Sequence, residues 1–143
     1  MHDPVHDELL RLTQRLLDSI AAGDWATYEE LCDPSLTAFE PEAAGQLVEG
    51  LAFHRFYFDL GGARGPHRTT MAAPRVRVAG DMAVVAYVRL NQRVSADGTP
   101  TTDAFAETRI WQRQGGQWRH VHFHRSPAGA APGGRMRVCS PFP

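Results

Sequence analysis

Three arginines, Arg89, Arg109 and Arg125, carry the clearest chemical signal in this sequence. Each lies in a segment that alternates with the two-residue period of a β-strand, and each shares its parity with large apolar side chains. If neighbouring strands bring them to one concave face, three guanidinium groups converge on one pocket. A guanidinium binds carboxylate or phosphate through paired hydrogen bonds. The pattern therefore indicates a pocket for a small anion.

Buried arginines need counter-charges, because an isolated buried charge is too costly to persist. Glu107 lies two residues before Arg109 at the same parity, and Glu40 is a second candidate partner. Three arginines against one same-face acid favour a bound anion as the remaining partner. Two other interpretations stay open: a purely structural network of ion pairs, and arginines whose charged ends reach solvent.

Three histidines, His120, His122 and His124, alternate along the last predicted strand. Such a row could hold a metal ion, but zinc sites usually take ligands from more than one element, and no cysteine or acid stands near them in sequence. We therefore predict no metal site and interpret these histidines as residues of a subunit interface.

The elements that must position these side chains follow an α+β order, with helices first and a long sheet afterwards. Apolar steps of three and four predict an amphipathic helix over Val5–Ala22, capped by Asp3 and ended by Gly23. Two shorter helices, Asp24–Cys32 and Leu51–Leu60, and a short strand, Leu36–Glu40, follow. Tight glycine turns then link four strands in an antiparallel meander: Thr69–Ala79, Met82–Val94, Thr101–Gln114 and Gln117–Ser126.

Neither face of this predicted sheet has the regular polar alternation of a solvated surface. The first helix can cover one face only. The other face would present Val84, Val88, Leu90, Ile110 and Trp118. A second copy of the chain is the simplest cover, and a C-terminal tail folded back over the face is the alternative. We expect self-association.

Composition bounds the remaining function classes. The 143 residues fit one domain over 1–127 followed by a flexible Pro-, Gly- and Ala-rich tail over 128–143. A net charge of −1 gives no reason to expect nucleic-acid binding, and no apolar run is long enough to span a membrane. The N-terminus resembles no secretory signal, so we expect a cytoplasmic protein. Cys32 and Cys139 have no zinc or redox spacing.

Several segments then identify a family resemblance. They are Gly23-Asp24-Trp25, Cys32-Asp33-Pro34, the run from Thr37 to Ala43, Leu47 to Leu51, Phe53 to Phe58, Glu107-Thr108-Arg109, Trp111, and Val121 to Ser126. In this order they closely resemble the association, or hub, domain of calcium/calmodulin-dependent protein kinase II, within the nuclear-transport-factor-2-like (cystatin-like) superfamily. The resemblance runs from about Leu9 to Ser126, and the FHRFYF and VHFHRS segments make it specific.

The resemblance implies a cone in which an N-terminal helix packs on a curved antiparallel sheet around an internal pocket. It also implies homo-oligomers, as dimers or larger rings, built through the outer sheet face. Arginines that match the three above line the pocket in that family, and the residue that matches His54 helps to hold small carboxylates. The predicted ligand-binding set is His54, Tyr57, Arg89, Glu107, Arg109 and Arg125.

The sequence also departs from the family pattern. It contains no kinase domain or calmodulin-binding segment, and its Asp59–Gly65 loop is shorter and lacks the tryptophan of the family. A bacterial relative without the kinase is the natural expectation, and all fifteen basic residues being arginine agrees with a GC-rich genome.

The same superfamily includes steroid isomerases, polyketide cyclases and epoxide hydrolases, so an enzyme is the alternative. Its base would be Glu107 or His54, with Tyr57 and Tyr87 as proton donors. Neighbouring arginines would lower the pKa of Glu107 and make it a weak base. We therefore predict a binding module with no catalytic residue and no cofactor.

Overall fold

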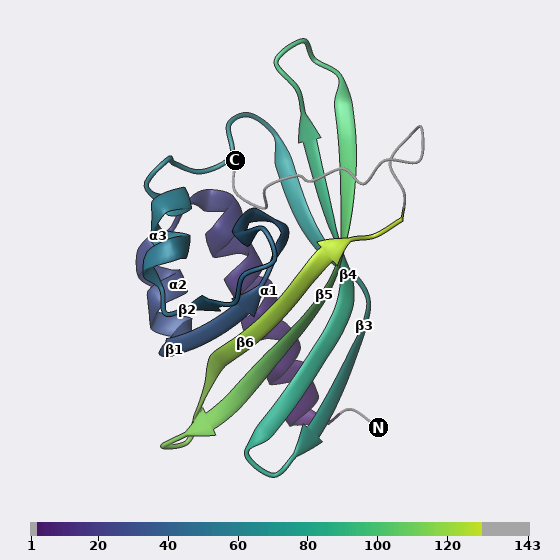
Figure 1. The fold of residues 1–143 in the computed structure, drawn as a ribbon. Coiled ribbons are helices and arrows are strands. Elements are labelled where there is room, and N and C mark those ends of the chain that lie inside the picture. Colours follow the sequence, from purple (N-terminus) through teal and green to yellow (C-terminus); the bar gives the residue numbers. More distant parts are fainter. Residues whose placement is uncertain (1–2, 130–143) are drawn as a thin grey trace.

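The computed structural model describes residues 3–129, in which one curved sheet wraps a long N-terminal helix (Figure 1). Helix α1 (Pro4–Ala22) begins as predicted, because the Asp3 carboxylate accepts a hydrogen bond from the Val5 amide at 2.9 Å. It ends at Gly23, whose φ of 69° suits glycine. Two short helices, α2 (Trp25–Leu31) and α3 (Ala52–Phe58), and a 3-10 turn at Pro41–Ala43 follow.

The sheet has six strands in the order β2-β1-β6-β5-β4-β3. Their bounds are β1 (Cys32–Phe39), β2 (Val48–Glu49), β3 (His67–Ala79), β4 (Met82–Val94), β5 (Pro100–Gln114) and β6 (Gln117–Pro127). The antiparallel meander from β3 to β6 is confirmed. The expectation of a wholly antiparallel sheet is wrong, since β1 pairs in parallel with β6.

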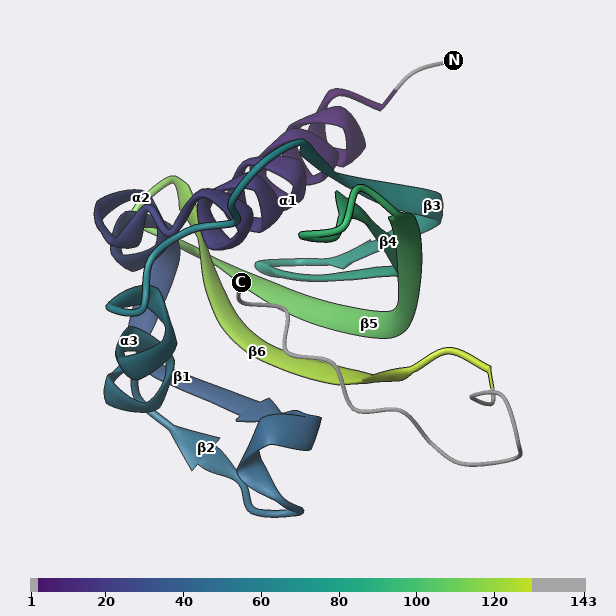
Figure 2. The same ribbon diagram turned by 90° about the horizontal axis from the view of Figure 1, so that it is seen from above.

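Helices α1, α2 and α3 all lie on the concave side of the sheet (Figure 2). The apolar stripe of α1 is fully buried at Leu9, Leu16 and Leu17. Polar contacts also fix this helix against the sheet, and in one of them the Trp111 indole donates a hydrogen bond to the Thr13 hydroxyl at 3.2 Å. Within residues 3–129, no helix is long and apolar enough to cross a bilayer.

The loop from α3 to β3 packs against the end of α1 through two glycines. A Cβ atom on Gly62 would lie 2.3 Å from the Ala22 carbonyl oxygen, and one on Gly23 would lie 2.6 Å from the Gly62 nitrogen. The Ala63 amide then donates to the Ala21 carbonyl at 2.8 Å. Backbone contact this close needs glycine, so the short loop is fixed to the helix end.

A β-bulge in β6 overturns part of the predicted face assignment. Ile110 pairs with His122 and Trp111 pairs with His120, so Val121 is the extra residue between them. The bulge turns His120 and Trp118 to the inner face, where both are buried. The expectation that His120 and Trp118 share the outer face with His122 is therefore wrong.

Candidate functional site

The predicted charged residues lie on three neighbouring strands around Glu107. In the register, Glu107 of β5 stands opposite Tyr87 of β4 and Arg125 of β6. Arg89 and Arg109 occupy the inner-face rows on either side, opposite Phe105 and Val85 respectively. The three arginines are 0%, 1% and 2% exposed and Glu107 is 2% exposed. The predicted convergence of these four side chains on one face holds.

Arg109 has a partner at each of its three guanidinium nitrogens. Its Nε donates to the Tyr87 hydroxyl at 2.8 Å and its Nη2 to Glu107 Oε1 at 3.1 Å. Its Nη1 lies 3.5 Å from His120 Nε2, and its guanidinium stacks 4.3 Å from the centre of the Phe123 ring. Burial acts to lower the pKa of Arg109, but Tyr87 and Glu107 outweigh it and raise that pKa. Arg109 is a fixed cation at the centre of the network.

Glu107 serves as the counter-charge for two arginines. Its Oε1 also accepts the Tyr87 hydroxyl at 2.6 Å, and its Oε2 lies 3.6 Å from Arg89 Nη1. Burial alone would raise the pKa of Glu107. The charges of Arg109 and Arg89 lower that pKa by more, so its net shift is downward. A carboxylate held ionised in this way is a poor general base.

Arg125 has a partner that the sequence did not indicate. Its Nη2 contacts both carboxylate oxygens of Glu42, and its guanidinium stacks 4.4 Å from the Phe105 ring centre. Burial raises the pKa of Glu42, and the contact with Arg125 offsets only part of that effect. Glu42 comes from the 3-10 turn and not from the sheet, so strand parity could not find it. The excess of arginines over acids is therefore smaller than predicted.

His54 lies beside this network, not inside it. Its Nε2 lies 2.7 Å from Oε1 of Glu40, and both side chains are fully buried. Phe123 connects the two groups, since its ring lies 5.4 Å from that of His54 and under Arg109. Glu40, which the sequence suggested as a partner for the arginines, therefore pairs with His54 instead.

Tyr57 occupies the side of the site near the 3-10 turn. Its ring packs against Phe53 and Phe56, with ring centres at 5.5 and 5.2 Å. Burial raises the pKa of its hydroxyl, and the charges of Glu42 and Glu40 add to that effect. Of the six predicted ligand-binding residues, Arg89, Glu107 and Arg109 form one set of ion pairs, and Arg125 pairs with Glu42. His54 contacts Phe123, and Tyr57 lies toward Glu42.

His120 supports the network from the core. Its Nδ1 lies 3.4 Å from the Cys32 sulfur, and its Nε2 faces Arg109. Burial, followed by the charge of Arg109, lowers the pKa of His120 well below its ordinary value. Among residues 3–129, no group of three or more histidine, cysteine or acidic side chains could hold a metal ion.

We expect the free energy of unfolding to decrease as the pH falls below about 6.5, the ordinary pKa of an unfolded histidine. Folded His120 has a lowered pKa, so below that pH the unfolded chain binds a proton that the folded chain does not. Stability is then lost with acidity, by up to about 1.4 kcal/mol per pH unit. Urea unfolding at fixed chain concentration and at two pH values, about 7 and 5.5, measures this slope. His120→Gln should flatten it, and equal slopes in both proteins would contradict the assignment.

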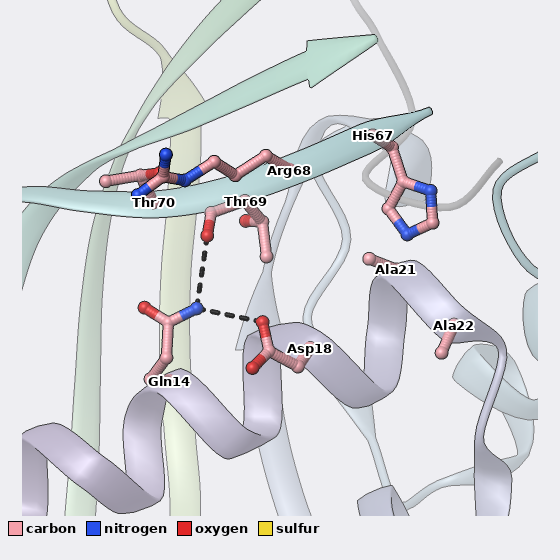
Figure 3. A pocket seen from close by; sticks show the side chains of 8 residues that line it. All are labelled: Gln14, Asp18, Ala21, Ala22, His67, Arg68, Thr69 and Thr70. Atoms are coloured by element: carbon pink, nitrogen blue, oxygen red, sulfur yellow. Dashed lines mark hydrogen bonds between the residues drawn. The ribbon is translucent and has the colours of Figure 1, made fainter. Parts of the chain in front are cut away.

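A groove of about 500 Å³ runs between α1 and β3 (Figure 3). Gln14 bridges it, because its side-chain amide donates to Asp18 Oδ1 at 2.8 Å and to the Thr69 carbonyl at 3.1 Å. The Thr69 hydroxyl in turn accepts a hydrogen bond from Arg89 Nε at 3.1 Å. One residue therefore links the groove to the buried arginines.

The outer face of the sheet is apolar and only half-buried at Val84, Val88, Leu90 and Ile110. In the part of the chain that the structure describes, no helix lies on this face (Figure 2). Phe39, which is 40% exposed, contacts the rings of His122 and His124 at its margin. The predicted uncovered surface is present, although Trp118 does not belong to it.

Comparisons with known proteins agree with this geometry. Residues 5–129 match the family described as the calcium/calmodulin dependent protein kinase II association domain. The association domain of the C. elegans kinase is 47% identical, with a TM-score of 0.81 over 85% of this chain and 95% of that one. The hub homology domain from Chlamydomonas reinhardtii is 48% identical, with a TM-score of 0.80 over 87% and 99%.

More distant structures share the fold. A nuclear transport factor 2-like protein from Salmonella enterica is 25% identical, with a TM-score of 0.71 over 90% of this chain and 95% of that one. The predicted fold class, α+β with the nuclear-transport-factor-2-like architecture, is confirmed.

Proposed function

This chain belongs to the family of calcium/calmodulin-dependent protein kinase II association domains, which form homo-oligomeric hubs, and from that premise we propose a binding module with two functions. It associates with itself through the outer sheet face, and it holds a small carboxylate or another small anion at its buried arginines. The second function rests on the ion network and not on the family match.

The charge balance of the network is the observation that carries the anion proposal. Arg89, Arg109 and Arg125 are fully buried, and two carboxylates, Glu107 and Glu42, contact them directly. Among residues 3–129, the three arginines thus outnumber by one the carboxylates in printed contact with them, since Glu40 partners His54. A single carboxylate would neutralise the cluster, and arginine is suited to bind it through paired hydrogen bonds.

Self-association is supported by the uncovered apolar surface of β4 and β5. Val84, Val88, Leu90 and Ile110 form a continuous patch that the described helices leave open. An apolar patch on a sheet face is typical of an interface between copies. The proposed assembly is a dimer or a larger ring of copies.

An enzymatic function finds no support in the site. Glu107 is held ionised by two arginines, and its lowered pKa makes it a weak base. His54 is occupied by Glu40 in the core. We therefore propose no catalytic residue and no cofactor.

Titration with propionate tests the anion site. We expect saturable binding by calorimetry or by NMR shifts, and a loss of about tenfold or more in affinity in Arg125→Met, because a hydrogen bond to a charged group contributes about 1.5–3 kcal/mol. Arg119→Met is the matched control, since Arg119 lies on the same strand but donates to the Glu30 carbonyl. The absence of saturable binding to the wild-type chain, or equal affinity in Arg125→Met, would refute the site.

A further inference from the structure

The loop between α3 and β3 forms one wall of another hollow, away from the buried arginines. This hollow, which we call the loop hollow, has a volume of about 390 Å³. It is lined by Leu60, Gly62, Ala63, Arg64, Arg93 and Val94. The loop supplies the first four of these residues, and the end of β4 supplies the other two. Arg93 follows Arg89 by four residues, about 13 Å along an extended strand, so the loop hollow and the buried ion network are separate places.

Backbone contacts hold the loop wall in place. Gly62 packs so closely on the end of α1 that a Cβ atom there would lie 2.3 Å from the Ala22 carbonyl oxygen. The next residue, Ala63, donates its amide to the Ala21 carbonyl at 2.8 Å. The loop runs along α1 before it enters β3 (Figure 2). The loop hollow is therefore preformed, and a partner that binds there does not first have to order the backbone.

Both walls of the loop hollow carry positive charge. Arg64 is exposed, and in the described part of the chain no acidic side chain forms an ion pair with it. Arg93, on the β4 wall, is half-buried. None of the six lining residues is an aspartate or a glutamate. Because a guanidinium binds a carboxylate through paired hydrogen bonds, the loop hollow favours an anionic partner.

Aliphatic side chains share the loop hollow with these arginines. Leu60 is 61% exposed and Val94 is 38% exposed, so the loop hollow is shallow. A small molecule would leave much of its surface in water there, whereas pockets for small ligands bury most of the ligand. A nucleic acid would use the arginines and leave the aliphatic side chains uncovered, and a net charge of −1 gives the chain no general attraction for it. A peptide that lies across the loop hollow uses both kinds of side chain.

We propose that the loop hollow binds a short segment of a partner protein that combines acidic and aliphatic residues. Carboxylates of the segment pair with Arg64 and Arg93, and its aliphatic side chains cover Leu60 and Val94. This interaction is additional to self-association and to anion binding, and it uses none of the residues that carry those two functions.

Three six-residue peptides test the proposal by NMR titration at 0.15 M salt. The first, acetyl-ELDELE-amide, carries both features. The second, acetyl-QLNQLQ-amide, keeps the leucines but has no charge, and the third, acetyl-EADEAE-amide, keeps the charge but has alanine in place of leucine. We expect the wild-type chain to bind the first peptide at least about tenfold more tightly than either of the others, because each control peptide loses one of the two complementary features.

Surface variants then locate the contact. Arg64→Gln should weaken the acidic leucine peptide by about threefold to fivefold, the range for one exposed ion pair, and leave the uncharged peptide unchanged. Leu60→Ser should remove most of the preference for leucine over alanine. Arg77→Gln is the matched control, because Arg77 is an exposed arginine of β3 that does not line the loop hollow. It should keep the wild-type affinity, since salt screens distant charges.

The proposal is wrong if the first peptide does not bind or binds no more tightly than the other two. It is equally wrong if Arg64→Gln and Arg77→Gln have the same effect, or if a single-stranded RNA of similar charge binds the loop hollow more tightly than the peptide. A lower propionate affinity in Arg64→Gln would make the loop hollow an entrance to the anion site and would also overturn it. Because propionate binding is measured separately, failure of one proposal leaves the other standing.

Discussion

Replacing Glu107 with glutamine is expected to lower the free energy of unfolding by about 3–5 kcal/mol, the usual cost of removing one partner of a buried ion pair. The substitution preserves shape but removes the carboxylate that contacts both Arg89 and Arg109. Two buried guanidinium groups would then repel each other with Glu42 as the remaining acid in the network. Because a domain of this size is stable by about 5–15 kcal/mol, this loss is a large share of the total free energy of unfolding.

Urea or thermal unfolding measures this loss. Glu49→Gln is the matched control, since Glu49 is an exposed residue of β2 and its replacement should change stability by less than about 0.5 kcal/mol. Equal stability of the two variants would show that Glu107 is not a structural counter-charge. The same protein tests the enzyme alternative: turnover of a small substrate by the wild-type chain, abolished in a folded Glu107→Gln variant, would replace the binding function with a catalytic one.

Replacing Val88 with glutamate is expected to break the assembly into smaller species. Val88 lies in the middle of the outer apolar patch, between Ala86 and Leu90 on β4. In an interface between copies, each copy would bury a carboxylate with no partner, which costs several kcal/mol per charge. The apparent dissociation constant should rise by at least about a hundredfold, because each 1.4 kcal/mol is a factor of ten.

Sedimentation velocity across a range of chain concentrations gives the masses of the two proteins. Val94→Glu is the control, because Val94 is 38% exposed and pairs with Pro100 at the end of the β4–β5 hairpin, outside the patch. It should assemble as the wild type does. If Val88→Glu keeps the wild-type mass, or if the wild type is a monomer at every concentration, the outer face is not the interface.

Strand parity made much of the site predictable. The meander places Tyr87, Arg89, Glu107 and Arg109 on the inner face because β4 and β5 pair without interruption from Met82 to Val94. Arg125 also falls there, since it lies beyond the bulge in β6. Parity depends only on counting residues, so it is reliable wherever a strand is regular.

The rest depended on features that local sequence does not encode. Residues 118–125 fit a β-strand with either set of alternate side chains facing inward, so nothing in their sequence marks Val121 as a bulge. The prediction therefore assigned His120 and Trp118 to the wrong face of the sheet. Glu42 reaches Arg125 from a separate turn, across 83 residues of sequence. The short β2 strand and the parallel pairing of β1 with β6 are likewise long-range contacts that no local pattern predicts.

Because β1 pairs with β6, the sheet cannot close until the last strand has left the ribosome. Thr37 and His122, which are hydrogen-bonded at 2.7 Å, are 85 residues apart. Pairing between such distant segments slows folding and leaves strand edges unprotected during synthesis.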